Sequence, residues 1–143
     1  MDKRLIFVSG ILFAVLVLVP QASAGTIISN SADWRDVYST IIFSKLTGNA
    51  SYFLVGPAHA QILPYSLSSS DNIEIISSAD NPFAIGYDTT LSLLGFSRVR
   101  ESEYRGVNLE LAKRLPEKVT NFIIIDDSYG YNAISVGPYG VVK

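Results

Sequence analysis

The fold of this chain is decided by residues 26–39, which read Thr26-Ile27-Ile28-Ser29-Asn30-Ser31-Ala32-Asp33-Trp34-Arg35-Asp36-Val37-Tyr38-Ser39. The stretch begins with a short β-branched apolar run, which is typical of a buried strand, and then breaks at Ser29, Asn30 and Ser31. Apolar residues follow at helical spacing, so that one helix face carries Trp34, Val37, Tyr38 and Ile41. Ser31 is the expected N-cap, and Asp33 places a negative charge in the first helical turn, where it favours the helix dipole. The stretch therefore predicts a strand, a turn and a helix.

The rest of the chain repeats this alternation. Further strands are predicted at 51–55, 73–77 and 122–125, and further helices near 58–67, 89–94 and 109–115. The segment 122–125 is apolar without alternation, as expected for a parallel strand that is covered on both faces. The segment 97–105 is charged and is expected to be exposed. The pattern predicts the α/β class, with a parallel sheet and helices on both of its faces.

The predicted core follows from the apolar positions of these elements. The side chains expected to be nearly fully buried are Ile28, Val37, Ile41, Phe53, Leu54, Ile75, Ile123 and Ile125. The first strand and the 122–125 strand are expected to be neighbours or to be separated by one strand.

Residues 1–24 have the pattern of a secretory signal peptide. Lys3 and Arg4 precede an apolar run over 5–19, and Ala22-Ser23-Ala24 matches a cleavage site of small residues. The alternative is a membrane anchor, but the apolar run is shorter than the roughly 20 residues that span a bilayer. We therefore expect a secreted protein with no stable transmembrane anchor after cleavage. Residues 25–143 are expected to form a single α/β domain, either complete or a truncated unit.

Composition excludes several classes of function. The chain has 11 basic and 13 acidic residues and a net charge of −2, so no basic stripe indicates nucleic acid as a partner. It has no cysteine, which excludes thiol catalysis, iron–sulfur clusters and cysteine-ligated zinc. The sequon Asn49-Ala50-Ser51 indicates either a glycan at Asn49 or an unused tripeptide in a turn.

Polar side chains gather after the predicted strands, where open α/β sheets bind ligands. The candidate ligand-binding residues are Ser29, Asn30, Asp33, Asp36, His59, Asp80, Asp127 and Tyr129. The competing interpretation is that turns require Asp, Asn and Ser for their own geometry. Asp126 and Asp127 follow the 122–125 strand directly, and two such carboxylates can hold Ca²⁺ or Mg²⁺, although helix capping explains one of them equally well.

Catalytic and nucleotide motifs give little support to an enzyme. His59 is the only histidine, and the nearest approach to a G-x-S-x-G elbow is 133–137, which lacks the first glycine. No dinucleotide-binding or Walker motif occurs. Trp34 and several tyrosines can stack on sugar rings, or they can pack in the core with their hydroxyls hydrogen-bonded.

Two stretches, 28–36 and 122–132, resemble archaeal surface-layer and cell-wall-binding proteins, in particular the type 2 cell-wall-binding repeat group. The resemblance extends to 55–60 and 85–87. It implies a Rossmann-like fold and a non-catalytic module of the cell envelope or cell surface, whose partner is a cell-wall polymer or a surface-layer protein. The alternative is a small extracellular hydrolase or metal-dependent enzyme acting on envelope glycan, with Asp126, Asp127 and His59 in its site.

Overall fold

The computed structural model describes residues 25–120 together with 123, 130, 132 and 135. Its elements are β1 (Thr26–Asn30), α2 (Trp34–Leu46), β2 (Ala50–Phe53), α3 (His59–Ile62), the 3₁₀ helix η1 (Leu63–Ser66), β3 (Ile73–Ser78), α4 (Tyr87–Leu93), β4 (Val99–Tyr104) and α5 (Val107–Lys113). The four strands are all parallel and lie in the order β2-β1-β3-β4. The fold is therefore α/β and Rossmann-like, as predicted.

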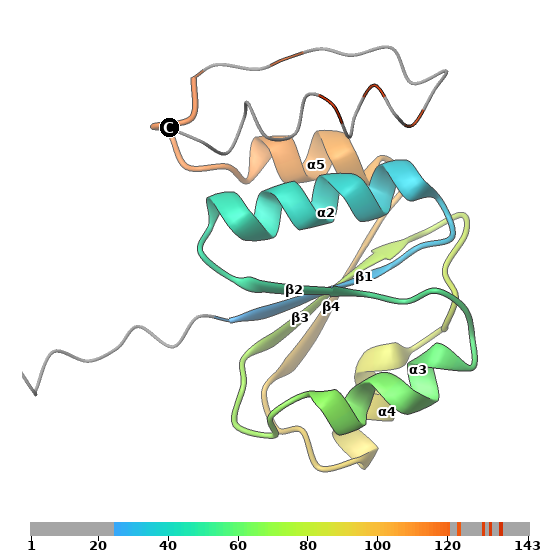
Figure 1. Ribbon diagram of the computed structural model, residues 1–143. Coiled ribbons are helices and arrows are strands. Elements are labelled where there is room, and N and C mark those ends of the chain that lie inside the picture. Colours follow the sequence, from blue (N-terminus) through green and yellow to red (C-terminus); the bar gives the residue numbers. More distant parts are fainter. Residues whose placement is uncertain (1–24, 121–122, 124–129, 131, 133–134, 136–143) are drawn as a thin grey trace, which may run out of the picture.

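Helices cover both faces of the sheet (Figure 1). On one face α2 packs against α5, and the core between them and the sheet contains Ile27 and Ile76. On the other face lie α3, η1 and α4, over a core that contains Ile28 and Ile75. Successive residues of a strand point to opposite faces, so the apolar runs of β1 and β3 fill both cores, which explains why they do not alternate with polar residues.

The inward face of α2 differs from the predicted one. Asp33, not Ser31, is the N-cap, and the buried residues of the helix are Thr40, Phe43 and Ser44. Two of these are polar, but Thr40 Oγ1 donates to the Asp36 carbonyl at 2.8 Å and Ser44 Oγ donates to the Thr40 carbonyl at 2.7 Å. Because these hydroxyls are satisfied within the helix, they can be buried against the sheet at little cost. The predicted stripe, which begins at Trp34, lies along another side of the helix and does not point into the core.

Three of the predicted core residues are confirmed as fully buried: Ile28, Leu54 and Ile75. The prediction is wrong for the other described ones. Val37 and Ile41 are only half-buried because α2 is turned about its axis. Phe53 is 43% exposed, and β1 is the only strand paired with its strand β2 among the described residues. Ile123 is 58% exposed and lies outside any strand, so the predicted strand does not hold at that position, while the rest of 122–125 lies outside the described residues.

The charged segment 97–105 contains a strand that the sequence pattern did not reveal. β4 pairs with β3 from Ile73↔Val99 to Ser78↔Tyr104. The side chains of β4 are mostly charged or polar, because an edge strand needs few apolar contacts. At its C-terminus α2 ends at Leu46 with Thr47 as its C-cap, and Gly48 follows with a positive φ of 75°. No helix in the described part of the chain is long and apolar enough to cross a membrane.

Candidate functional site

The carboxyl ends of β1 and β3 form the topological switch point of the sheet. The chain leaves β1 toward α2 on one face and leaves β3 toward α4 on the opposite face. Open α/β sheets bind ligands in the crevice that opens between two such strands. In this chain the loop after β3 closes that crevice, because Ala32 N donates to the Asn81 carbonyl at 2.8 Å.

Asn30 holds the closing loop in place. Its side chain is fully buried, and its Nδ2 donates to Ser77 Oγ at 2.9 Å and to the Ala84 carbonyl at 2.6 Å. Its Oδ1 accepts from Phe83 N at 2.9 Å and from Ala84 N at 3.0 Å. Two donated and two accepted bonds occupy the whole amide. The predicted ligand-binding residue Asn30 is therefore engaged in structure.

The acidic residues of the β1–α2 turn are also engaged locally. Ser31 Oγ donates to Asp36 Oδ2 at 2.8 Å and accepts from Asp33 N at 3.0 Å. Asp33 accepts from Arg35 N at 2.9 Å, and its carboxylate lies 2.7 Å from the Arg35 guanidinium. The hydrogen bonds from Arg35 lower the pKa of Asp33. Ser29 Oγ is fully buried on the α2 face and has no hydrogen-bond partner among the described residues.

The remaining predicted site residues lie apart from this turn or outside the described residues. His59 begins α3 beyond β2, where its Nδ1 accepts from Val55 N at 3.3 Å, and Asp80 is exposed in the loop after β3. The ligand and metal candidates Asp126, Asp127 and Tyr129 lie outside the described residues. Within the part of the chain that the structure describes, no group of three His, Cys, Asp or Glu side chains is placed to hold a metal ion.

Gly130, one of the described residues after 120, lies next to α2. A β-carbon at position 130 would lie 3.7 Å from the Trp34 indole, so Gly130 sits beside the first turn of α2. The sequence predicts that the turns 29–36 and 126–129 lie side by side, because both follow predicted strands of one parallel sheet. This stays a prediction, because 126–129 lie outside the described residues.

Sequence reasoning missed a cleft of about 400 Å³ at the carboxyl ends of β3 and β4. Its walls come from the ends of the two strands and from the loop between β3 and α4: Ser77, Ser78, Ala79, Pro82, Ala84, Ile85, Gly86, Glu101 and Glu103. Glu101 is half-buried there, and it accepts from Ser77 Oγ at 2.5 Å and from Asp88 N at 3.2 Å. Glu103 is exposed two residues further along the same face of β4. The sequence signal that could have revealed β4 is the alternation that places Val99, Glu101 and Glu103 on one face of a strand. The neighbouring charged residues conceal this alternation.

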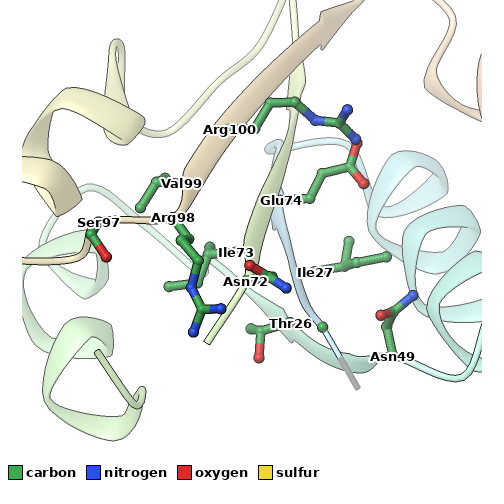
Figure 2. A pocket seen from close by; sticks show the side chains of 11 residues that line it. Thr26, Ile27, Asn49, Asn72, Ile73, Glu74, Ser97, Arg98, Val99 and Arg100 are labelled. Atoms are coloured by element: carbon green, nitrogen blue, oxygen red, sulfur yellow. The ribbon is translucent and has the colours of Figure 1, made fainter. Parts of the chain in front are cut away.

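Two further hollows lie elsewhere. An apolar groove of about 450 Å³ runs between the start of α2 and the end of β2, and we call it the α2–β2 groove. Its apolar side chains are Trp34, Val37, Tyr38, Ile41, Phe53, Leu54, Val55 and Phe83, and Gly130 also lines it. At the opposite, amino end of the strands lies a polar pocket of about 350 Å³, shown in Figure 2.

The amino-end pocket is built around an ion-paired glutamate. Glu74 lies 2.8 Å from Arg100 and 2.7 Å from Arg114, and Figure 2 shows Arg100 directed toward Glu74 while Arg98 extends away from it. Burial raises the pKa of Glu74, but the two guanidinium groups outweigh burial, so that the net pKa is lowered. Asn49, the sequon residue, is half-buried in the wall of this pocket and donates to Thr47 Oγ1 at 2.8 Å.

No protein-family model, curated protein or solved structure matches this chain. The resemblance to the type 2 cell-wall-binding repeat group therefore remains a prediction from sequence motifs.

Proposed function

We propose that this chain is a secreted module of the cell envelope or cell surface that binds an envelope glycan without catalysing a reaction. The ligand site in this proposal is the cleft at the carboxyl ends of β3 and β4. The observation that supports it is the placement of Glu101, a half-buried carboxylate held by two donors at the edge of the sheet where α/β proteins bind ligands.

The chemistry of the cleft suits a sugar. Glu101 and Glu103 present carboxylate oxygens, which accept hydrogen bonds from sugar hydroxyls more strongly than neutral oxygens do. Pro82, Ala84 and Ile85 line the same cleft with apolar surface that can pack against ring carbons, and Ile85 is 93% exposed. A volume of about 400 Å³ lies within the range of pockets for small ligands.

The hydrogen bonds around the cleft also fix the orientation of the Glu101 side chain. Asn30 donates to Ser77 Oγ, and Ser77 Oγ donates in turn to Glu101. The buried amide therefore positions the carboxylate through one hydroxyl, so the binding group is prepared before the ligand arrives. Such preorganisation reduces the entropy that binding loses.

The competing hypothesis is a hydrolase or metal-dependent enzyme that uses Asp126, Asp127 and His59. His59 lies beyond β2, while the cleft lies over β3 and β4 on the other side of β1, and His59 Nδ1 is engaged by Val55 N. This separation favours ligand binding at the cleft over an enzymatic reaction that would need both the cleft residues and His59. Release of reducing sugar from isolated envelope material would support the enzyme instead.

The test is co-sedimentation of the purified chain with isolated envelope fractions. Glu103→Gln removes one carboxylate from an exposed position, so it should weaken binding about tenfold, the loss expected for one charged hydrogen bond, without changing the thermal midpoint. Glu117→Gln, at an exposed position outside the cleft, is the matched control and should bind like the unmodified chain. Unchanged binding by a folded variant carrying both Glu101→Gln and Glu103→Gln would overturn the proposed site.

A further inference from the structure

The cleft at the carboxyl ends of β3 and β4 is acidic, and no basic side chain lies in its described wall. Glu101 and Glu103 project from the same face of β4, at positions about 6.6 Å apart along the strand. The sequence contains no lysine or arginine between Lys45 and Arg98, so β3, the loop after it and α4 supply no positive side chain. Arg100 of β4 pairs with Glu74, which lines the pocket at the other end of the strands.

Neither carboxylate of the cleft is neutralised within the described part of the chain. Glu101 Oε1 accepts from Ser77 Oγ at 2.5 Å and Oε2 accepts from Asp88 N at 3.2 Å, and both donors are neutral groups. Glu103 forms no hydrogen bond or ion pair with another described residue. A half-buried carboxylate loses hydration that neutral donors replace only in part, so the cleft favours a ligand that brings a positive charge.

The walls of the cleft suit an organic cation better than a metal ion. Ca²⁺ takes about six to eight oxygen ligands, whereas the cleft offers two carboxylates, and no group of three His, Cys, Asp or Glu side chains is placed for a metal among the described residues. Pro82, Ala84 and Ile85 give the same cleft apolar surface. A protonated amine on a carbon skeleton matches both features, because its charge can meet the carboxylates while its carbons cover the apolar wall.

We propose that the group recognised by the cleft is an amino sugar with a free, protonated amine, carried by the envelope glycan. Because the proposed function names a glycan as the ligand, this identification rests on it. An ammonium group has three N–H donors and no acceptor, which complements the acceptor-only oxygens of Glu101 and Glu103. The ring carbons pack against Ile85. N-acetylation of the sugar removes the positive charge, so the cleft distinguishes the free amine from the acetylated form of the same sugar.

The first test uses immobilised polyglucosamine and the same polymer after N-acetylation. The unmodified chain should bind the free-amine polymer about tenfold more tightly, the difference expected for one charged hydrogen bond. A cationic polymer attracts any acidic protein, so two variants of equal charge are compared. Glu103→Gln should bind the free-amine polymer about tenfold more weakly with an unchanged thermal midpoint, and Glu117→Gln, at an exposed position outside the cleft, should bind like the unmodified chain. Equal losses for the two variants would show general charge attraction and overturn the proposal.

The second test separates this proposal from the proposed function. Envelope fractions are digested with protease, which removes lysine amines, and are compared before and after N-acetylation with acetic anhydride. Acetylation should lower co-sedimentation of the unmodified chain about tenfold and should abolish its difference from Glu103→Gln, because both changes remove the same contact.

The other outcomes of this second test are distinct. If acetylation has no effect while Glu103→Gln still weakens binding, the cleft recognises neutral sugar groups, so the amino-sugar proposal fails and the proposed function stands. Loss of binding after protease digestion alone would identify a protein ligand and overturn both. Loss of binding on addition of a chelator would indicate a bridging metal ion and overturn the amine.

Discussion

Asn30 and Ala84 lie 54 residues apart in sequence and exchange two hydrogen bonds, one from Asn30 Nδ2 to the Ala84 carbonyl at 2.6 Å and one from Ala84 N to Asn30 Oδ1 at 3.0 Å. A fully buried side chain at the end of β1 thus takes the place of a backbone partner for the loop after β3. This pair explains why the switch-point crevice is closed and why the open cleft lies over β3 and β4 instead.

The first prediction concerns this pair. Asn30→Ala should lower the free energy of unfolding by about 3 kcal/mol, because it leaves the backbone groups of Phe83 and Ala84 buried without partners. Chemical denaturation measures the loss, and Asn72→Ala, at an exposed position, is the control and should change stability little. A loss at Asn30 no greater than that of the control would mean that water replaces the amide easily and that the loop is not held by it.

The second prediction concerns the acid limb of stability. The pKa of Glu74 is lower in the folded chain than in the unfolded chain, so unfolding at low pH takes up a proton at this residue. Its contribution to stability is fully present above the unfolded pKa of about 4.3 and is lost as the pH falls through the folded pKa. The Glu74→Gln variant should therefore lose less stability on acidification than the unmodified chain.

Thermal unfolding at a series of pH values checks this sign. Glu117→Gln, which replaces an exposed glutamate of the same chemistry, is the control and should keep the acid limb of the unmodified chain. Parallel curves for Glu74→Gln and the unmodified chain would show that the ion pairs with Arg100 and Arg114 are not the source of the acid sensitivity.

The third prediction compares two isoleucines that sequence reasoning places together in the core. Ile75 is fully buried between β1 and β4, whereas Ile123 is 58% exposed. Ile75→Ala should cost about 2–5 kcal/mol of unfolding free energy because it leaves a cavity, and Ile123→Ala should cost less than about 1 kcal/mol. Denaturant titrations of the two variants decide the matter, and similar losses would return Ile123 to the core.

The fourth prediction concerns processing at the N-terminus. Cleavage after Ala24 should leave a mature protein that starts at Gly25, the residue directly before β1. A β-carbon at position 25 would lie 2.8 Å from Asn49 Oδ1 and 3.3 Å from the Asn72 carbonyl, so a larger residue there requires the Asn49 side chain to move. N-terminal sequencing of the exported protein is the measurement, and an intact Met1 terminus on a membrane-bound form would contradict the signal peptide.

The site shows where sequence reasoning stops. Ser29, Asn30, Asp33 and Asp36 were correctly expected at the carboxyl end of the first strand, because that placement follows from a strand followed by a helix. The engagement of Asn30 by Ser77 and Ala84 was not foreseen, because these partners come from β3 and from the loop after it. Asp36 and Asp33 are instead held within their own turn, by Ser31 and Arg35. Glu101 was missed altogether, because its meeting with Ser77 depends on the pairing of β3 with β4.

The local elements with their own sequence signals follow from the order of the amino acids: the β-branched runs of β1 and β3, the end of α2 before Gly48, and the strand–helix alternation that requires a parallel sheet. Long-range packing sets the rotation of α2 about its axis, the burial of Thr40 and Ser44, and the exposed position of Phe53. Periodicity states which residues share a helix face but not which face meets the sheet. That choice depends on the whole set of contacts with β1, β2 and α5, which exists only after the distant segments have come together.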